Sequence, residues 1–156
     1  MESPVNAIDT PNRTLLCGVC GGEREARFRR ITDAHTVHGE TFDVTTTCYE
    51  CLSCGEELAD PAAPDMMTPI YDAYRAKLGL LSPAKIREIR TKSGLSQVAF
   101  ATLLGMSPAT INGYELGSPH NPKEDVIFRL AALPGAVPML LRTRGHLLKP
   151  GQRPGR

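Results

Sequence analysis

Residues 94–117 read GLSQVAFATLLGMSPATINGYELG, and this stretch is the most informative about the structure of the second half of the chain. It holds two short helical patterns, 97–104 and 108–116, each with a serine before it and a glycine after it. Ser96 and Ser107 are typical helix N-caps, and a glycine after a helix favours its termination. Two short helices joined through one glycine turn predict a helix-turn-helix.

The side chains of this stretch fit the packing that two crossing helices require. Ala101 is small where the helices approach each other, and Met106 and Ile111 are apolar residues for the core beneath the second helix. The N-terminal end of the second helix would then project toward a DNA major groove, with helix N-termini available for phosphates. A helical bundle that binds no nucleic acid is the alternative that the same pattern allows.

Further helical patterns lie on both sides of the helix-turn-helix. Each begins at a proline, which is favoured in the first turn of a helix, and most end near a glycine. The predicted starts are Ser82-Pro83, Pro122 and Pro138, and a separate short helix has Thr68 as N-cap, Pro69 as its first residue and Gly79 as its end.

Residues 83–133 resemble the lambda-repressor-like (XRE) family of DNA-binding domains, which are bundles of about five helices. The resemblance implies that Gln97 contacts a phosphate. It also implies that Arg90 and Glu115 form a largely structural salt bridge between the first and third helices. The positions that it assigns to base reading are Pro108, Ala109, Thr110 and Gly113, with Asn112 beside them.

Direct base readout by these positions is expected to be modest. The four base-reading positions include no Arg, Lys, Asn or Gln, which are the side chains that make bidentate base contacts. Only Thr110, with Asn112 beside it, is able to touch a base edge or a thymine methyl group. We therefore expect dimer spacing or DNA shape to supply part of any specificity. The groups open to phosphate contact are the helix N-terminus at Ser107, the side chains of Lys85, Lys92 and Lys123, and the arginines of the tail.

The first half of the chain contains two copies of the pattern C-x-x-C-G. Cys17 and Cys20 form one pair, and Cys51 and Cys54 form the other. Two residues between thiolates let both sulfur atoms reach one ion, and the glycine permits the tight turn that points backbone N–H groups at sulfur. The four thiolates predict one structural, tetrahedral Zn²⁺ site, and the alternative is that the free cysteines merely pack.

Cys48 adds a competing pair, because Cys48 and Cys51 also have two residues between them. Of the two competing pairs, only the one ending in Cys54 is followed by glycine, which leaves Cys48 as a spare thiol. His38 and Glu40 ahead of this pair imitate the signature of zinc nucleobase deaminases. The spacing from Glu40 to Cys48 is too short for that fold, and the first cysteine pair would stay unexplained. We therefore expect no enzymatic activity.

Charge is distributed unevenly, although the whole chain of 156 residues has a formal net charge of +1. Residues 1–60 carry five basic and eleven acidic side chains, a balance of −6, and residues 61–81 carry two of each. Residues 82–156 carry eleven basic and four acidic side chains, a balance of +7. An acidic half joined to a basic half indicates two modules with different partners.

These patterns together predict an α+β protein of two small domains in the cytoplasm. β-branched residues and alternation between 25 and 49 favour strands with a turn at His38-Gly39, and 60–65 is a breaker-rich linker. We see neither a signal peptide nor an apolar run near the roughly 20 residues that span a bilayer. The predicted parts are a disordered lead-in (1–16), a zinc-binding β domain (17–60), a linker with a short helix (61–81), a helix-turn-helix domain (82–148) and a basic, disordered tail (149–156).

A paired-cysteine β module followed by a linker helix and an XRE domain resembles the MqsA family of antitoxins, whose N-terminal half is a YgiT-type zinc finger. The resemblance covers about residues 17–145 and includes the Cys-Gly-Glu-Glu run at 54–57. It implies a homodimer, held by the C-terminal domains, that represses its own operon on double-stranded operator DNA. It also implies that the zinc domain neutralises a toxin, typically a small basic RNase. The alternative is a phage or mobile-element repressor with a purely structural zinc module and no toxin partner.

Overall fold

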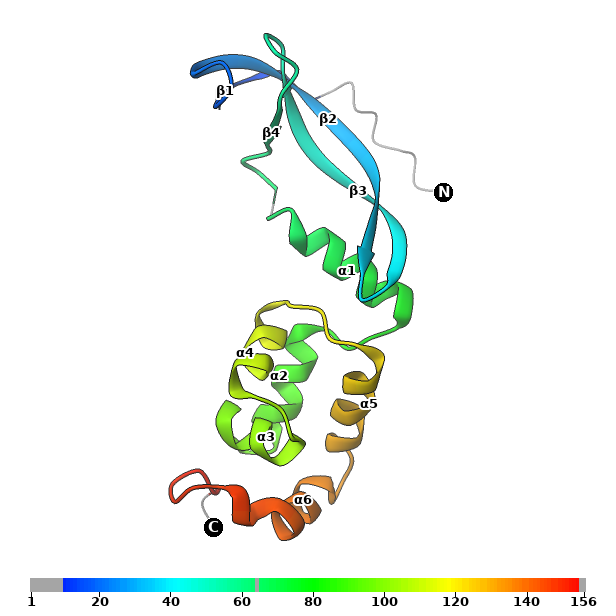
Figure 1. Cartoon of the computed structure of the whole chain (residues 1–156), viewed down its shortest axis with the longest axis vertical. Coiled ribbons are helices and arrows are strands. Elements are labelled where there is room, and N and C mark those ends of the chain that lie inside the picture. Colours follow the sequence, from blue (N-terminus) through cyan, green and yellow to red (C-terminus); the bar gives the residue numbers. More distant parts are fainter. Residues whose placement is uncertain (1–9, 64, 155–156) are drawn as a thin grey trace. The chain divides into compact units, whose positions relative to one another are not determined.

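A computed structural model describes residues 10–63 and 65–154 of the chain, so the disorder expected for 1–9 and 155–156 lies outside the described residues. The described chain forms two compact units, and the division between them falls in the sequence between Ile70 and Tyr71. The first contains a four-stranded antiparallel sheet in the order β1-β2-β3-β4, and the second is helical (Figure 1). The architecture is α+β, as predicted.

The sheet is built around one long ribbon, in which β2 (Gly22–Val37) pairs with β3 (Glu40–Cys51). The turn of this ribbon lies at His38 and Gly39, where the sequence predicted it. Both residues have positive φ, 48° and 83°, which is the backbone twist that suits a two-residue hairpin. The edge strands are β1 (Arg13–Cys17), which pairs with β2, and β4 (Glu57–Ala59), which pairs with β3.

The edge strands differ from the sequence prediction. Residues 13–16 fall in the expected disordered lead-in, but they form most of β1 and pair with the start of β2. β4 was not predicted either. Strands of five and three residues carry too little pattern to be recognised locally. They form because the ribbon offers unpaired backbone N–H and C=O groups along both edges.

The helices follow the predicted order, with two corrected starts. α1 begins one residue before Thr68, because Asp65 Oδ1 accepts the N–H groups of both Met67 and Thr68 and acts as the cap. α6 begins two residues before Pro138, which lies in the first turn, where a missing N–H is tolerated. The helices are α1 (Met67–Leu78), α2 (Pro83–Lys92), α3 (Gln97–Leu104), α4 (Pro108–Leu116), α5 (Pro122–Ala131), α6 (Ala136–Arg144) and the 3-10 turn η1 (Gly145–Leu147).

The helical unit encloses an apolar core to which α2, α3, α4 and α5 all contribute. Phe100 of α3 and Phe128 of α5 stack with ring centroids 6.3 Å apart. Ala101 and Ile111 are fully buried, and Met106 packs against the core, as the helix-turn-helix pattern predicted. The buried members are Ile86, Ile89, Leu95, Ala99, Phe100, Ala101, Leu103, Ile111, Phe128, Ala131 and Leu148.

Within residues 10–63 and 65–154, no single helix is long and apolar enough to cross a membrane. Only α5 and the segment Ala136–Leu147 taken together would reach that length and composition, and they are bent by 101° at the break between them.

Candidate metal centre and nucleic-acid interface

Four cysteines from two turns converge at one end of the sheet. Cys17 and Cys20 belong to the turn between β1 and β2, and Cys51 and Cys54 belong to the turn between β3 and β4. Their sulfur atoms all lie within 4.8 Å of one another, with Cys17 Sγ 3.6 Å from Cys54 Sγ and Cys20 Sγ 3.9 Å from Cys51 Sγ. These separations are too long for disulfides. Four sulfur atoms bound tetrahedrally at about 2.3 Å lie about 3.8 Å apart, so the cluster fits one metal ion and confirms the predicted four-cysteine site.

The backbone of the two turns holds the cysteines in this arrangement. Gly21 and Gly55 have left-handed φ values of 70° and 78°, which glycine adopts without strain. The Gly21 N–H donates to Cys17 O at 3.0 Å, and the Gly55 N–H donates to Cys51 O at 2.8 Å. The Cys20 N–H donates to Cys17 Sγ at 3.4 Å. The repeated C-x-x-C-G pattern therefore builds two equivalent turns, as predicted.

The thiols of the cluster differ in how readily they ionise. Burial raises the pKa of Cys51, but the N–H groups of Cys54 and Ser53 outweigh it and lower this pKa to about 7. The Glu56 N–H lowers the pKa of Cys54, but the side-chain hydrogen bond with Cys20, together with burial, raises it to about 12. Several thiolates side by side repel one another, so full ionisation of the cluster calls for a cation.

Cys48 is separated from this cluster by the alternation of β3. Tyr49 and Cys51 are buried on the face of β3 that carries the cysteine cluster. Cys48 and Glu50 project from the opposite face, because successive side chains of a strand alternate. Burial and the nearby charge of Glu57 raise the pKa of the Cys48 thiol. The glycine after Cys54 thus identified the correct pair, and Cys48 is a spare thiol, half-buried on β3.

The resemblance to nucleobase deaminases fails on geometry. Glu40 is the first residue of β3 and Cys48 lies near its other end, so the two are roughly 26 Å apart along the strand. A general acid or base must lie within hydrogen-bond reach of the reacting group. Glu40 therefore cannot serve a reaction at the cysteine cluster.

The helix-turn-helix consists of α3 and α4, with Gly105 between them at a left-handed φ of 74°. Ser96 caps α3 by accepting the Ala99 N–H, and Ser107 caps α4 by accepting the Thr110 N–H. Each cap satisfies one of the N–H groups that a helix leaves unpaired at its start. Both helices therefore begin at the residues that the sequence predicted.

The side chains expected at the DNA surface fall into two groups. Ser107, Pro108, Ala109 and Asn112 are exposed on α4, and Lys123 is exposed in the first turn of α5, a separate element. Thr110, Gly113 and Gln97 are half-buried. Thr110 Oγ1 lies 2.7 Å from Ser107 Oγ, so the hydroxyl group best suited to touch a base is bonded to the cap.

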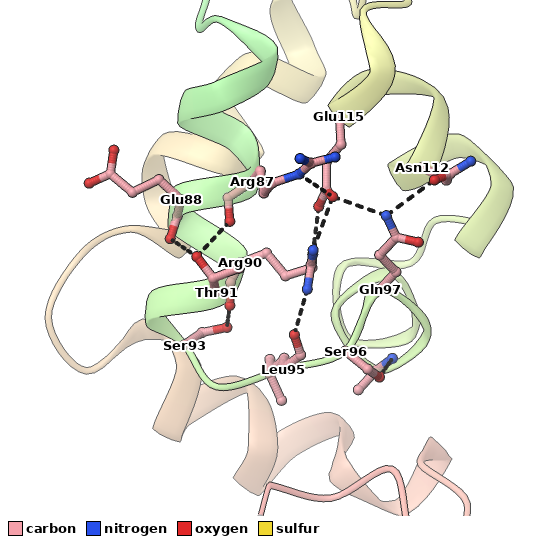
Figure 2. Close-up of polar contacts among 11 residues, drawn as sticks. Arg87, Glu88, Arg90, Thr91, Ser93, Leu95, Ser96, Gln97, Asn112 and Glu115 are labelled. Carbon is pink, nitrogen blue, oxygen red and sulfur yellow. Dashed lines mark hydrogen bonds and ion pairs between the residues drawn. The ribbon is translucent and has the colours of Figure 1, made fainter.

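A fully buried carboxylate joins α2, α3 and α4 (Figure 2). Arg90 donates from Nε to Glu115 Oε1 at 2.5 Å and from Nη2 to Oε2 at 3.0 Å. Arg87 Nε and Gln97 Nε2 donate to the same Oε2 at 3.4 and 3.0 Å. Burial raises the pKa of Glu115, but the hydrogen bonds from Arg90 and Gln97 outweigh it and hold this pKa below its ordinary value. The salt bridge between Arg90 and Glu115 that the resemblance implied is present, and Arg87 and Gln97 donate further hydrogen bonds to the Glu115 carboxylate.

Asp125 is a second buried carboxylate, and no sequence pattern predicted its burial. Its Oδ1 accepts the Leu81 N–H and lies 2.8 Å from His120 Nε2, and its Oδ2 accepts from Arg129 Nε at 2.6 Å. Burial raises the pKa of Asp125, but its hydrogen bonds, that from Arg129 first, hold it below the ordinary value. The carboxylate is therefore ionised, and His120 Nε2 must be the donor.

Comparison with known protein families identifies the helical unit. Residues 86–140 match the family model described as Helix-turn-helix, and the match runs from α2 into α6. The chain therefore carries an XRE-type helix-turn-helix domain of the kind found in DNA-binding transcription regulators. A comparison of the chain with curated proteins finds no match.

Proposed function

We propose that this protein is a dimeric transcriptional repressor that binds operator DNA through α4 and neutralises a toxin through its metal-binding unit. The observation that carries the proposal is the helix-turn-helix match at 86–140, on a pair of helices whose second member exposes its N-terminal residues. The antitoxin role rests on the resemblance to the MqsA family. The site of action is the cytoplasm, on the nucleoid when the protein is bound to DNA.

The metal in the four-cysteine site is proposed to be a single structural Zn²⁺. Four thiolates in tetrahedral arrangement suit zinc or iron, and the compact cluster leaves no open position for a substrate. Elemental analysis of the purified full-length chain tests this. One zinc per chain is expected, and one iron per chain would contradict the assignment.

The proposed toxin-binding surface lies on the β unit. A groove of about 430 Å³ is lined by residues of β1 and β4, among them Leu16 and Leu58, with Glu56 and Glu57 beside them. Leu16 and Val19 are 73% and 67% exposed, which is unusual for apolar side chains so close together in the chain. An apolar surface with two carboxylates beside it suits a basic protein partner, such as a small RNase.

The proposed dimer contact is the outer face of α5. Val126, Leu130 and the following Leu133 recur at helical spacing and are 55%, 55% and 56% exposed. Such a stripe is self-complementary when two copies meet around a two-fold axis. Leu130→Glu should therefore give a monomer in sedimentation experiments, while Thr143→Glu on α6 should not change the mass.

DNA binding is tested with the duplex upstream of the protein's own gene. The full-length chain should retard this duplex at low salt. Ala109→Glu, which puts a carboxylate on the exposed face of α4, should abolish the retardation, while Thr143→Glu should not. Failure of the wild-type chain to bind any such duplex at low salt would contradict the repressor proposal.

Toxin neutralisation is tested by co-expression with a small RNase encoded beside this gene. The wild-type chain should restore growth, and Val19→Glu in the groove-side turn should not, while Thr143→Glu serves as the matched control. If DNA binding is intact and growth is not restored, the chain is a repressor with a purely structural metal module, as in a phage or mobile element.

A further inference from the structure

Gln97 uses both of its side-chain N–H groups inside the protein. Its Nε2 donates to Glu115 Oε2 at 3.0 Å and to Asn112 Oδ1 at 3.3 Å (Figure 2). A primary amide nitrogen has two N–H groups, so these two bonds exhaust it. Gln97 therefore has no free side-chain donor for a DNA phosphate, which is the role that the family resemblance assigns to it.

The orientation of the Gln97 amide follows from charge. Glu115 is ionised and buried, and an ionised carboxylate only accepts hydrogen bonds. The amide must therefore turn its nitrogen, and not its oxygen, toward Glu115. The second N–H on that nitrogen then faces α4, where it meets Asn112 Oδ1.

Asn112 is oriented in turn by Gln97. Its oxygen accepts from Gln97, so its amide nitrogen is directed away from Gln97 and into solvent (Figure 2). Within the described part of the chain, no hydrogen bond from Asn112 Nδ2 is found, and the residue is exposed. A pair of N–H donors is thus presented outward in a fixed direction.

Two neighbours of Asn112 on α4 have short side chains or none. Ala109 lies one helical turn before it and Gly113 follows it, so neither can extend as far as the Asn112 side chain. Thr110 is bonded to Ser107. Among the residues expected at the base-reading surface, Asn112 is the longest polar side chain with unused donors.

We propose that Asn112 reads a base edge and that Gln97 is a positioning residue. Gln97 donates one N–H to the buried Glu115 carboxylate and the other to Asn112 Oδ1, and in this way it fixes the direction of the Asn112 amide. The inference rests on the proposed role of α4 as the recognition helix. In the major groove, outward N–H donors match N7 and O6 of guanine, N7 of adenine and O4 of thymine, and they oppose the N4 amino group of cytosine. The operator base that faces Asn112 is therefore one that offers an acceptor, and guanine offers two.

The decisive experiment selects binding sites from a random duplex DNA library with the full-length chain. Asn112→Ala should relax one position of the selected sequence and lower affinity for the wild-type consensus about tenfold, within the range for one side chain reading one base pair. Affinity for unrelated DNA should not change, because no phosphate contact is lost.

Asn112→Asp keeps the acceptor for Gln97 and replaces the outward amide nitrogen with a carboxylate oxygen. The added charge should lower affinity for every duplex, although the shorter Asp side chain reaches less far than the glutamate of Ala109→Glu, so the readout for this variant is the selected base and not the affinity. The outward donor becomes an outward acceptor, so the selected base at that position should change to cytosine, whose N4 amino group donates. Both variants change an exposed residue, and unchanged thermal unfolding would show that the fold is intact.

Gln97→Ala separates positioning from phosphate binding. A positioning residue should relax the same base position as Asn112→Ala, and the double variant should bind no more weakly than Asn112→Ala by itself. A phosphate ligand would instead weaken binding to every sequence, and its effect would add to that of Asn112→Ala.

Two failures are distinguishable. If the wild-type chain selects no sequence and binds no DNA, the proposed function itself falls. If the wild-type chain selects a consensus and Asn112→Ala selects the same consensus with equal affinity, the function stands and the role of Asn112 is overturned.

Discussion

The two units of this chain are stabilised in different ways. The buried cluster of the β unit holds five residues, and two of them, Cys17 and Cys51, are metal ligands. The helical unit buries eleven residues in its core, with Phe100 stacked on Phe128. A small sheet with so little apolar burial depends on a bound ion, as very small domains commonly do. The helical unit has no such need.

The two units also place their charges differently. In the β unit, Arg27 and Arg29 form ion pairs with Glu50 at the surface, where such pairs contribute little. In the helical unit, Glu115 and Asp125 are buried, and each accepts hydrogen bonds from residues outside its own helix, such as Arg90 for Glu115 and the Leu81 N–H for Asp125. Buried carboxylates of this kind are costly when one partner is lost. The helical unit is therefore the more sensitive of the two to single changes at charged residues.

Removal of the metal should give the largest effect, and it should unfold one unit only. Structural zinc supplies about 10–16 kcal/mol of folding free energy in small domains, far more than the five-residue cluster of the β unit can replace. We expect a strong chelator to abolish the calorimetric transition of the sheet in the full-length chain and to leave the helical transition in place. A single shared transition, lost as a whole, would show that the units are not independent.

Loss of the Glu115 carboxylate should give the next largest effect, confined to the helical unit. Glu115→Ala leaves Arg90, whose side chain is 15% exposed, without its partner, and should destabilise this unit by about 3–5 kcal/mol. Urea unfolding followed by helical circular dichroism measures this loss. Glu88→Ala is the matched control, because Glu88 pairs with Lys85 and Lys92 at the surface, and its midpoint should match the wild type. Equal losses for both variants would contradict the burial argument.

Acid should weaken the helical unit through the same carboxylates. The folded-state pKa values of Glu115 and Asp125 lie below their ordinary 4.5 and 3.8. Their contribution is therefore complete above about pH 4.5, and it is lost as the pH falls through the folded-state values. The difference in unfolding free energy between wild type and Glu115→Gln, measured from pH 7 to pH 3, should shrink toward the acid end. A difference that stays constant over this range would exclude linkage through Glu115.

Cys48→Ser should have the smallest effect. Cys48 lies on the face of β3 opposite the ligands, so the variant should keep one metal per chain and a sheet transition close to that of the wild type. Cys54→Ser is the matched variant, and it should lose the metal. Elemental analysis of the two proteins side by side decides this, and the reverse outcome would reassign the ligand set.

Features that depend on a few neighbouring residues were predictable. The Ser96 and Ser107 caps, the turn at Gly105 and the two C-x-x-C-G turns each involve groups within about four residues of one another. The residue types required at such positions are few, because only some side chains cap a helix and glycine is the residue that adopts left-handed φ without strain. The four-cysteine set followed from this local chemistry, although its ligands come from two separate turns.

Features that depend on distant partners were not predictable. β1 and β4 exist only because the ribbon offers edges, and Leu81 meets Asp125 only when α2 and α5 pack together.

The two modules, their order, the four ligands and the starts of α3 and α4 were predictable because they depend on local spacing and on the distribution of charge along the chain. The hydrogen bonds of Gln97, in contrast, depend on how the helices pack. A glutamine at a helix start is able to contact a DNA phosphate. The packing of α4 on α3, however, brings the buried Glu115 carboxylate next to the half-buried Gln97, whose amide nitrogen donates to it. A buried charge must be hydrogen-bonded, and that requirement directs the Gln97 amide nitrogen toward Glu115, which leaves its second N–H for Asn112 Oδ1.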